Sequence, residues 1–561
     1  MKLRFRWLTF VVAAGVVLIA TATTAAVAST TTPATHVSGK LVLDNESGAT
    51  WTCQFNAFNP AVNGTSVGFV YETLEFVDIL KAGAVTPWLA TSSSWSSDFE
   101  TLTFTIRSGV KWSDGLPFSA KDVVYTFNAM KGDSAIDLNA IWKADGGPLT
   151  GVTQSGSNKV VFKFDSPSQS YFYYVADQTP IVPEHIWYKL KQSDLQSYAD
   201  TNPVGTGPYE VKSCQPDNIE YVPNTDYWQS KPGHPVPSIA QVDYPAFLSN
   251  TPANLFLSQG QAQWGSQYIP SIQSFYIAKG PDRHYYFAPI LNVSLFPNLD
   301  NPLLGQLAVR KAISLAIDRT AVGARGESGY EKAANQEGVV LPTFKNWYDS
   351  SLPKTTYSAS EAEQVLKAAG FTKGSNGIFQ KGGKSLSFTI KTVSGFTDWD
   401  ASLAIITQEL KAVGISVTVE DENSGTYVSD LSSGKFQLAY AGSGGPYPSA
   451  GPSPYYELRG VLFSGNIGTT DYSRFKSSST DALFAEYPAA SPSKQVTIMH
   501  EIEKVMVDQI PFIPVTEGVD WFQYSTAQFG GWPTAADPYA QGGIYNTPDV
   551  GVVLTHLYPK G

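Results

Sequence analysis

Histidine and cysteine, the side chains that most often bind metals or act as nucleophiles, are scarce here: six His and two Cys among 561 residues. The histidines are scattered, and none lies near another His or a Cys at the spacing of a metal site; they are His36, His185, His234, His284, His500 and His556. No His-Glu-x-x-His zinc helix occurs, and Ser, His and Asp form no triad signature. We therefore expect no metal site, no cofactor and no enzyme activity. A secreted hydrolase stays a remote alternative, because a glycosidase needs only two carboxylates across a cleft.

The two cysteines, Cys53 and Cys214, leave two interpretations open. In an oxidising compartment they could form a disulfide that closes a very long loop. They could equally be two buried free thiols, because separation along the chain does not decide between the two.

The overall charge argues against nucleic acid as a partner. The formal net charge is −11 and the pI is near 5.1, whereas nucleic-acid binders need a basic face. Charged residues make up only 16% of the chain, while Gly and Pro are plentiful, which is typical of a loop-rich secreted protein.

The N-terminus has the pattern of an export signal. Basic residues precede an apolar run from Leu8 to Ala20, and Ala26-Val27-Ala28 offers a cleavage site. We expect a signal peptide at 1–28 and a linker at 29–36; the alternative is an uncleaved membrane anchor. Because no Cys lies near the cleavage site, a lipid anchor has no attachment point, and the expected location is extracellular or in the cell envelope.

Hydrophobic periodicity predicts the elements that would position a site. Residues 101–107 alternate as a half-buried strand, and Ser119 is placed to cap a helix that runs to Met130. Another strand is predicted at 159–164, and a helix is predicted from the apolar stripe at 68–80. Residues 307–319 and 360–369 have helical periodicity, and Gly370 would end the second helix. Residues 398–440 alternate helix, strand, helix and strand, which indicates an α/β fold.

Several segments resemble a known family. The stretch Leu102–Phe127, which includes Arg107-Ser-Gly-Val-Lys-Trp-Ser-Asp-Gly115, is similar to the signature of the family 5 extracellular solute-binding proteins of ABC importers. Seven further matches follow in the family's order: Tyr71–Leu74, Pro87–Ala90, Ile181–Trp187, Pro203–Tyr209, Asn224–Trp228, Val309–Arg319 and Ile510–Pro514.

The resemblance implies a type II periplasmic-binding-protein fold of three parts, in which two α/β lobes enclose a ligand. Lobe I would comprise 37–80, 200–285 and 505–561, the extra inserted domain 81–199, and the second lobe 286–504. Cys53 and Cys214 would then lie in the same lobe. A monomer that works with permease and ATPase subunits is implied by the family as well.

The ligand class follows from a departure from the family pattern. Peptide-binding relatives carry an acidic residue after the last strand of the second lobe, but residues 441–456 contain no carboxylate. An ammonium group buried there would have no counter-charge, which favours a neutral ligand.

Aromatic and amide side chains in the cleft segments fit sugar recognition, in which rings pack on C–H faces and amides bind hydroxyl groups. The residues 531–539 also resemble an element of the cello- and manno-oligosaccharide-binding branch. We therefore expect an oligosaccharide, with an oligopeptide as the alternative. The predicted ligand contacts are Trp51, Asn56, Gln261, Trp264, Tyr268, Trp399, Tyr447, Trp521 and Trp532.

Overall fold

The structure is a computed structural model that describes residues 36–45, 48–59, 65–442 and 451–560. Residues 34–561 form one compact unit. The predicted signal peptide and nearly all of the predicted linker lie outside the described residues. Within the described ranges, no helix combines the length and the apolar composition that crossing a bilayer requires.

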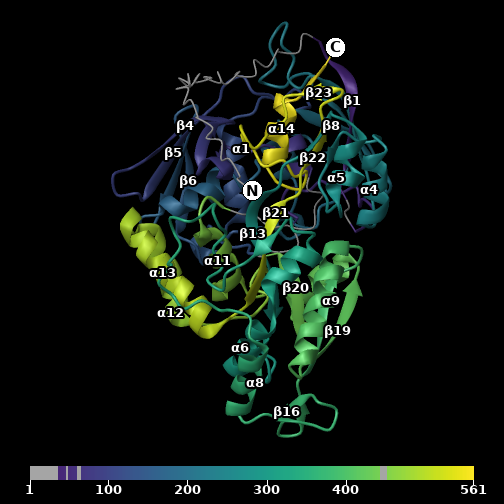
Figure 1. The fold of residues 1–561 in the computed structure, drawn as a ribbon. Helices are drawn as coiled ribbons and strands as arrows, with labels where there is room; N and C mark the ends of the chain where they lie inside the picture. Colours follow the sequence, from purple (N-terminus) through teal and green to yellow (C-terminus); the bar gives the residue numbers. More distant parts are fainter. Residues whose placement is uncertain (1–35, 46–47, 60–64, 443–450, 561) are drawn as a thin grey trace, which may run out of the picture. The chain divides into compact units, whose positions relative to one another are not determined.

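The first sheet has seven strands (Figure 1). Their order is β12 (Arg283–Tyr285), β22 (Gln523–Ser525), β11 (Trp264–Gly265), β1 (Ser38–Asp44), β10 (Ile239–Pro245), β9 (Asn218–Pro223) and β8 (Tyr209–Gln215). Strand β1 is parallel to both β10 and β11. Its Leu41 and Leu43 are fully buried, so burial of alternate apolar residues fixes the register of this central strand.

The second sheet has six strands, in the order β14 (Lys332–Ala333), β21 (Ile513–Asp520), β13 (Ala288–Pro297), β20 (Leu438–Gly442), β18 (Ser387–Val393) and β19 (Ser416–Glu422). Strands β13 and β21 run antiparallel, side by side (Figure 1). Each is connected along the chain to a strand of the first sheet: β12 leads into β13, and β21 leads into β22. The short segments 286–287 and 521–522 therefore connect the two sheets.

A third sheet of four antiparallel strands contains β4 (Ala90–Trp95), β5 (Thr101–Ile106), β7 (Lys159–Phe164) and β6 (Leu149–Ser155). Helix α1 (Ala120–Met130) contacts β6 and β7. Ser119 caps the helix in a capping box with Asp122, as the sequence predicts. The predicted strands at 101–107 and 159–164 are confirmed.

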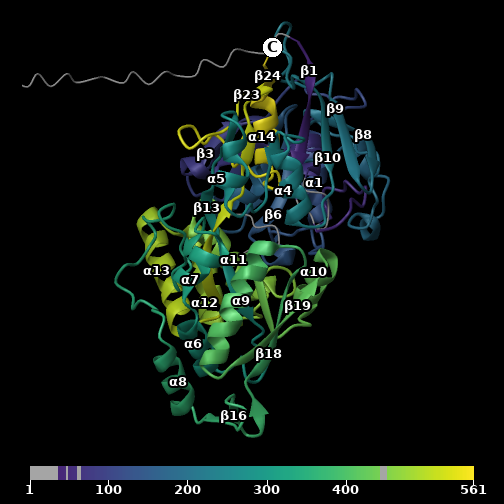
Figure 2. The same ribbon diagram turned by 45° about the vertical axis from the view of Figure 1, so that its right-hand side comes forward.

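Helices α9 (Thr397–Ala412) and α10 (Ser424–Ser433) lie alongside β19 and β18 (Figure 2). The α/β pattern predicted for 398–440 is confirmed. Helix α8 (Ala359–Ala368) is followed by Gly370, whose φ of +85° suits a residue without a Cβ atom. The other helices and strands are β2 (Glu75–Asp78), β3 (Ala84–Pro87), α2 (Phe172–Ala176), α3 (Glu184–Trp187), α4 (Asn250–Ser258), α5 (Ile272–Phe275), β15 (Thr372–Lys373), β16 (Phe379–Lys381), β17 (Lys384–Ser385), α11 (Pro454–Leu462), α12 (Ser478–Glu486), α13 (Pro492–Gln509), β23 (Phe529–Gly530), α14 (Asp549–His556) and β24 (Tyr558–Pro559).

The helix predicted at 68–80 is wrong. Residues 66–70 form a kinked turn, η1, in which Val67 and Gly68 have non-helical backbone angles, and the chain then enters strand β2. Gly68 has φ +94°, and a Cβ atom there would lie 2.9 Å from the backbone nitrogen of Gly551. Close packing against α14 therefore determines the local conformation, and the apolar stripe reflects burial on several sides.

The helix predicted at 307–319 is shorter than expected. Helix α6 (Leu307–Ala316) ends before Ile317, and Asp318 caps the short α7 (Arg319–Ala321). Arg310 and Arg319 are both buried despite their charge. The guanidinium group of Arg310 donates to four backbone carbonyls, those of Leu304, Gly305, Gln509 and Ile510.

The sheets bear on the predicted lobes at the segment 505–561. Strand β21 belongs to the six-stranded sheet, whereas the segment 505–561 was expected wholly in lobe I. The difference arises because β21 pairs with β13 before the chain returns to β22 in the other sheet. The exact lobe boundaries stay a prediction.

Candidate ligand-binding site

The carboxyl ends of parallel strands are the usual place for a ligand site in an open α/β sheet. In the seven-stranded sheet, β1 and β11 end at Asp44 and Gly265, and Tyr268 follows shortly after. In the six-stranded sheet, the parallel strands β18 and β20 end at Val393 and Gly442. The segment after β18 leads into α9, and the segment after β20 lies outside the described residues.

These two carboxyl edges are in direct contact at the start of α9. The side-chain oxygen of Asn250 accepts hydrogen bonds from the backbone nitrogen of Thr397 at 2.8 Å and from its hydroxyl at 3.1 Å. The backbone nitrogen of Asn250 donates to the carbonyl of Gly395 at 3.3 Å. Gly395 has φ +95°, and a Cβ atom there would lie 2.7 Å from the carbonyl oxygen of Leu248. A glycine is therefore required for this approach.

A second contact joins the loop after β11 to residues 326–330. The hydroxyls of Tyr268 and Ser328 are hydrogen-bonded at 2.5 Å. The Tyr330 hydroxyl donates to the carbonyl of Ile269 at 3.1 Å and accepts from the backbone nitrogen of Ile272 at 2.8 Å. The loop after β11 is thus bound at several points to the residues that precede β14.

Aromatic rings surround this second contact. Trp521, which lies in one of the two segments that connect the sheets, has its ring 5.6 Å from that of Tyr268, 4.8 Å from Phe287 and 6.0 Å from Tyr330. Trp521 is only half-buried. On the other side of the edge, the ring of Trp399 packs 5.5 Å from that of Tyr440. Tyr268 and Trp399 are 5% and 8% exposed, so the half-buried Trp521 is the ring in this position that is open to pack against the apolar face of a ligand.

Carboxyl groups are buried beside these rings. Burial raises the pKa of Asp398 at the start of α9 to about 7 and that of Glu331 to about 8. The pKa of Glu327 is well above its ordinary value because of burial first and the charges of Glu331 and Asp398 second. Protonated carboxyls donate as well as accept hydrogen bonds. Such a site can therefore bind a ligand hydroxyl group either as a donor or as an acceptor.

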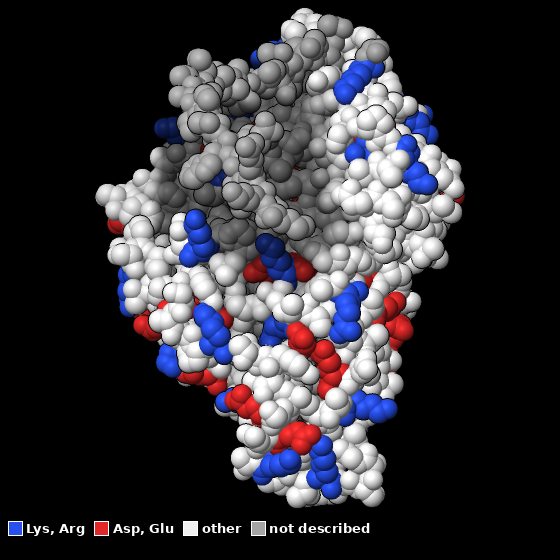
Figure 3. All heavy atoms as spheres, in the orientation of Figure 1, with Lys and Arg blue, Asp and Glu red and all other residues white. Residues whose placement is uncertain are grey.

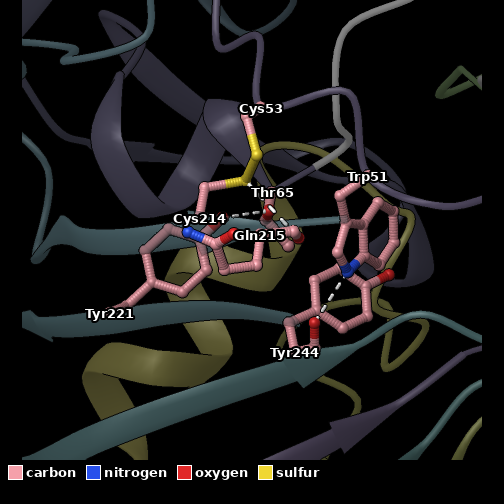
Figure 4. Close-up of a disulfide and its surroundings, with 7 residues drawn as sticks. All are labelled: Trp51, Cys53, Thr65, Cys214, Gln215, Tyr221 and Tyr244. Atoms are coloured by element: carbon pink, nitrogen blue, oxygen red, sulfur yellow. Dashed lines mark hydrogen bonds between the residues drawn. A yellow bond between two sulfur atoms is a disulfide. The ribbon is translucent and has the colours of Figure 1, made fainter. Parts of the chain in front are cut away.

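The disulfide between Cys53 and Cys214 is present, with a Cα–Cα distance of 5.6 Å (Figure 4). Cys214 lies near the carboxyl end of β8, and Cys53 lies in the loop that follows β1. The bond therefore ties this loop to the carboxyl edge of the seven-stranded sheet. In the same loop, the Trp51 ring packs 4.6 Å from that of Tyr244, and its indole nitrogen donates to the Tyr244 carbonyl at 2.8 Å.

Of the predicted contacts, four lie at the carboxyl edges: Trp51, Tyr268, Trp399 and Trp521. Tyr447 lies outside the described residues. Trp264 and Trp532 are buried and pack against each other at 5.5 Å. Their indole nitrogens donate to the backbone carbonyls of Gly542 and Ser525. This arrangement favours a packing role for both.

The two predicted amide contacts lie elsewhere. Asn56 is fully buried, and its side-chain nitrogen donates to the carbonyls of Leu195 and Tyr198 at 2.7 and 2.8 Å, so it joins two loops. Gln261 is exposed and precedes β11, at the opposite end of the strand from Tyr268. Asn250, Glu327 and Glu331 were missed, because nothing in their local pattern marks them as neighbours of the edge.

Three other kinds of site find no support. Among the described residues, no group of His, Cys, Asp and Glu has a metal-binding arrangement. Residues 64–68 have the Gly-x-Ser-x-Gly spacing of a hydrolase elbow, which needs an exposed serine on a strand-to-helix turn. Ser66 is instead buried in the turn η1. Over the lower half of the face shown in Figure 3, basic and acidic side chains are interspersed, unlike the basic face of a nucleic-acid binder.

Comparison with known proteins decides the family. Residues 84–460, more than half of the chain, match the bacterial extracellular solute-binding proteins, family 5 (middle region). The chain belongs to this family. Family 5 proteins bind solutes, in agreement with the prediction of a binding protein rather than an enzyme.

Among family 5 relatives, the oligopeptide-binding protein AppA of Bacillus subtilis is 27% identical over 339 residues, or 56% of this chain. The alignment spans 57% of that protein's length. The mannohexaose-bound periplasmic oligopeptide-binding protein of Thermotoga maritima superimposes with a TM-score of 0.86 at 25% identity, covering 93% of this chain and 98% of that one. The structure of AppA with a nonapeptide gives 0.78 at 22% identity, covering 94% and 100%. The predicted α/β periplasmic-binding-protein fold is confirmed.

Proposed function

We propose that this protein is the extracytoplasmic solute-binding subunit of an ABC importer and captures a neutral oligosaccharide between the carboxyl edges of its two larger sheets. The two sheets would close on the ligand by bending at segments 286–287 and 521–522. The closed form would then deliver the ligand to permease and ATPase subunits. The protein would act as an exported monomer.

The observation that carries the oligosaccharide is the chemistry of the edges. Trp521 supplies a half-buried ring there, the buried rings of Tyr268 and Trp399 lie at the same edges, and buried carboxyls with raised pKa values lie nearby. Rings and uncharged polar groups together suit a neutral ligand with apolar faces and many hydroxyls. The similarity to a mannohexaose-bound relative, at a TM-score of 0.86, supports the same class.

An oligopeptide is the second candidate, and one observation favours it. Although residues 441–456 contain no carboxylate, Glu327 and Glu331 act electrostatically on Tyr440 of β20. An acidic group next to β20 could therefore meet a peptide's amino terminus after all. The relative AppA is described as an oligopeptide-binding protein and is seen with a nonapeptide.

Thermal denaturation with a panel of mannohexaose, cellohexaose, a nonapeptide and nickel separates these candidates. A ligand that binds only the folded state raises the melting temperature by mass action. We expect a rise with one or both sugars and no rise with nickel. A rise with the nonapeptide alone would show that the ligand is a peptide and not an oligosaccharide. Release of shorter sugars from mannohexaose or cellohexaose would point to a hydrolase.

A pair of tryptophan variants tests the location of the site. Trp521→Ala removes a half-buried ring at the edge, and we expect the affinity for mannohexaose to fall by the equivalent of ~1–3 kcal/mol. Trp95→Ala is the matched control, since Trp95 is also half-buried but packs against Phe99 and Phe164 in the four-stranded sheet region. Equal affinities for the two variants would move the site away from Trp521.

A further inference from the structure

Three carboxyl groups, here called the carboxyl cluster, interact electrostatically with one another close to the contact between Tyr268 and Ser328. They belong to Glu327, Glu331 and Asp398, which are at most 5% exposed. Glu327 accepts a hydrogen bond from the Ser402 hydroxyl at 2.6 Å, and Glu331 accepts one from the Thr516 hydroxyl at 2.5 Å. The cluster thus lies between α9, β21 and the segment that precedes β14.

The cluster has hydrogen-bonding capacity left over. The Oε2 atom of Glu327 and the hydroxyl of Tyr440 are both buried without a hydrogen-bond partner. Tyr440 is fully buried, and its pKa is raised by burial first and then by the charges of Glu327 and Glu331, so its hydroxyl lies close to the cluster. A buried carboxylate with an unsatisfied oxygen is far less favourable than the protonated acid.

The groups around the cluster do not neutralise it. Helix α9 contributes Asp400 beside Asp398, and β21 contributes Glu517 beside Glu331. Lys332 acts on Glu517, whose pKa burial raises to about 7. The other facing groups are the hydroxyls of Tyr440 on β20 and Tyr268 from the seven-stranded sheet. Mutual repulsion and burial therefore both favour retention of protons.

The first sheet covers this cluster. The Tyr268 hydroxyl is hydrogen-bonded to that of Ser328, which is next to Glu327 in the chain. The pKa of Tyr268 is raised to about 12 by burial first, and the charges of Asp398 and Glu327 are among the later causes. Separation of the two edges would withdraw Tyr268 and admit water to the cluster. Hydrated carboxyls titrate near their ordinary pKa values, so the closed form holds more protons than the open form.

We propose that closure of the two sheets over a ligand is coupled to proton uptake by Glu327, Glu331 and Asp398. This inference rests on the proposed function, because it assumes that ligand binding closes the two edges. In this structure, where the two edges are in contact, the pKa values of Asp398 and Glu331 are about 7 and 8, above their ordinary values. Closure is therefore fully favoured at pH below the open-state values, and this contribution is lost as the pH rises through about 7–8.

Isothermal titration with mannohexaose at pH 7.5, in buffers of different ionisation enthalpy, measures the protons bound. We expect net uptake, and affinity that falls by up to about tenfold per pH unit and per coupled proton between the ordinary carboxyl pKa values and about pH 8, and that levels off above it. Glu331→Gln and Asp398→Asn should each reduce the uptake. The matched control is Glu503→Gln on α13, which does not belong to the carboxyl cluster. Burial raises the pKa of Glu503 to about 8 as well, but its Oε2 accepts a hydrogen bond from the backbone nitrogen of Asp349. Zero uptake by the wild type, or equal uptake by all variants, would overturn the proposal.

Small-angle scattering without ligand keeps the two hypotheses distinguishable. We expect the radius of gyration of the wild type to increase from pH 5.5 to 9, and that of a Glu331→Gln/Asp398→Asn double variant to stay constant. If mannohexaose gives no binding heat, the oligosaccharide function fails and the scattering decides the proton coupling alone. If it binds without proton uptake, the coupling fails and the proposed function stands.

Discussion

Loss of the Cys53–Cys214 disulfide should destabilise the folded protein mainly through the unfolded chain. The bond closes a loop with a sequence separation of 161 residues. The loop-entropy relation then gives about 5 kcal/mol at 25 °C for its removal. Both cysteines are only partly buried, so a Cys53→Ser/Cys214→Ser double variant loses little packing, and most of the effect is the released chain entropy.

The expected change in melting temperature follows from the size of the protein. An unfolding entropy near 2.1 cal/mol/K per residue over roughly 500 residues is about 1 kcal/mol/K, so the double variant should melt about 5 °C lower. Differential scanning fluorimetry or calorimetry measures this shift. The reasoning also requires that a reductant lower the melting temperature of the wild type by the same amount and leave that of the double variant unchanged.

Two results would refute this account. A wild type that melts at the same temperature with and without reductant, after loss of the bond is verified by mass spectrometry, would show that the disulfide does not limit the unfolded chain. A reductant effect on the double variant would show that the shift has another origin.

Two further predictions concern single side chains. Asn250→Ala removes two hydrogen bonds that its side-chain oxygen accepts from Thr397 and that form only when the sheet edges meet. The affinity for mannohexaose should therefore fall by ~1–2 kcal/mol in calorimetric titration. Its melting temperature without ligand should change little, and an unaltered affinity would exclude this contact from closure. Arg310→Met leaves four carbonyls without their guanidinium donor, and we expect a loss of ~3 kcal/mol in denaturant unfolding. Since Lys lacks the forked geometry, Arg310→Lys should recover only part of this loss; full recovery would show that charge alone matters.

Local sequence signals predicted the elements whose residues interact with near neighbours. Alternation predicted β5, and Ser119 as a capping residue predicted the start of α1. The same reasoning failed at 68–80, because Gly68 adopts its conformation to pack against Gly551, far along the chain. The end of α6 was likewise set by tertiary contacts of Arg310 and Arg319 with the segment 509–514.

The candidate site divides in the same way. Trp521 and Tyr268 could be predicted because each follows or precedes a recognisable strand at the edge of a sheet. Trp264 looked equally suitable, but its position on a central strand buries it against Trp532. A tryptophan's type gives the chemistry it can perform, whereas its exposure depends on what packs over it.

By itself, the sequence determined the α/β fold, the family and the export pattern, because these depend on periodicity and on motifs whose residues lie close together in the chain. Only the tertiary structure decided which side chains meet: Glu327 with Asp398 below Tyr268, Asn250 with Thr397, and Cys53 with Cys214. These partners are separated by tens to hundreds of residues, and their contact arises only when the two sheets bury their apolar faces and bring the carboxyl edges together.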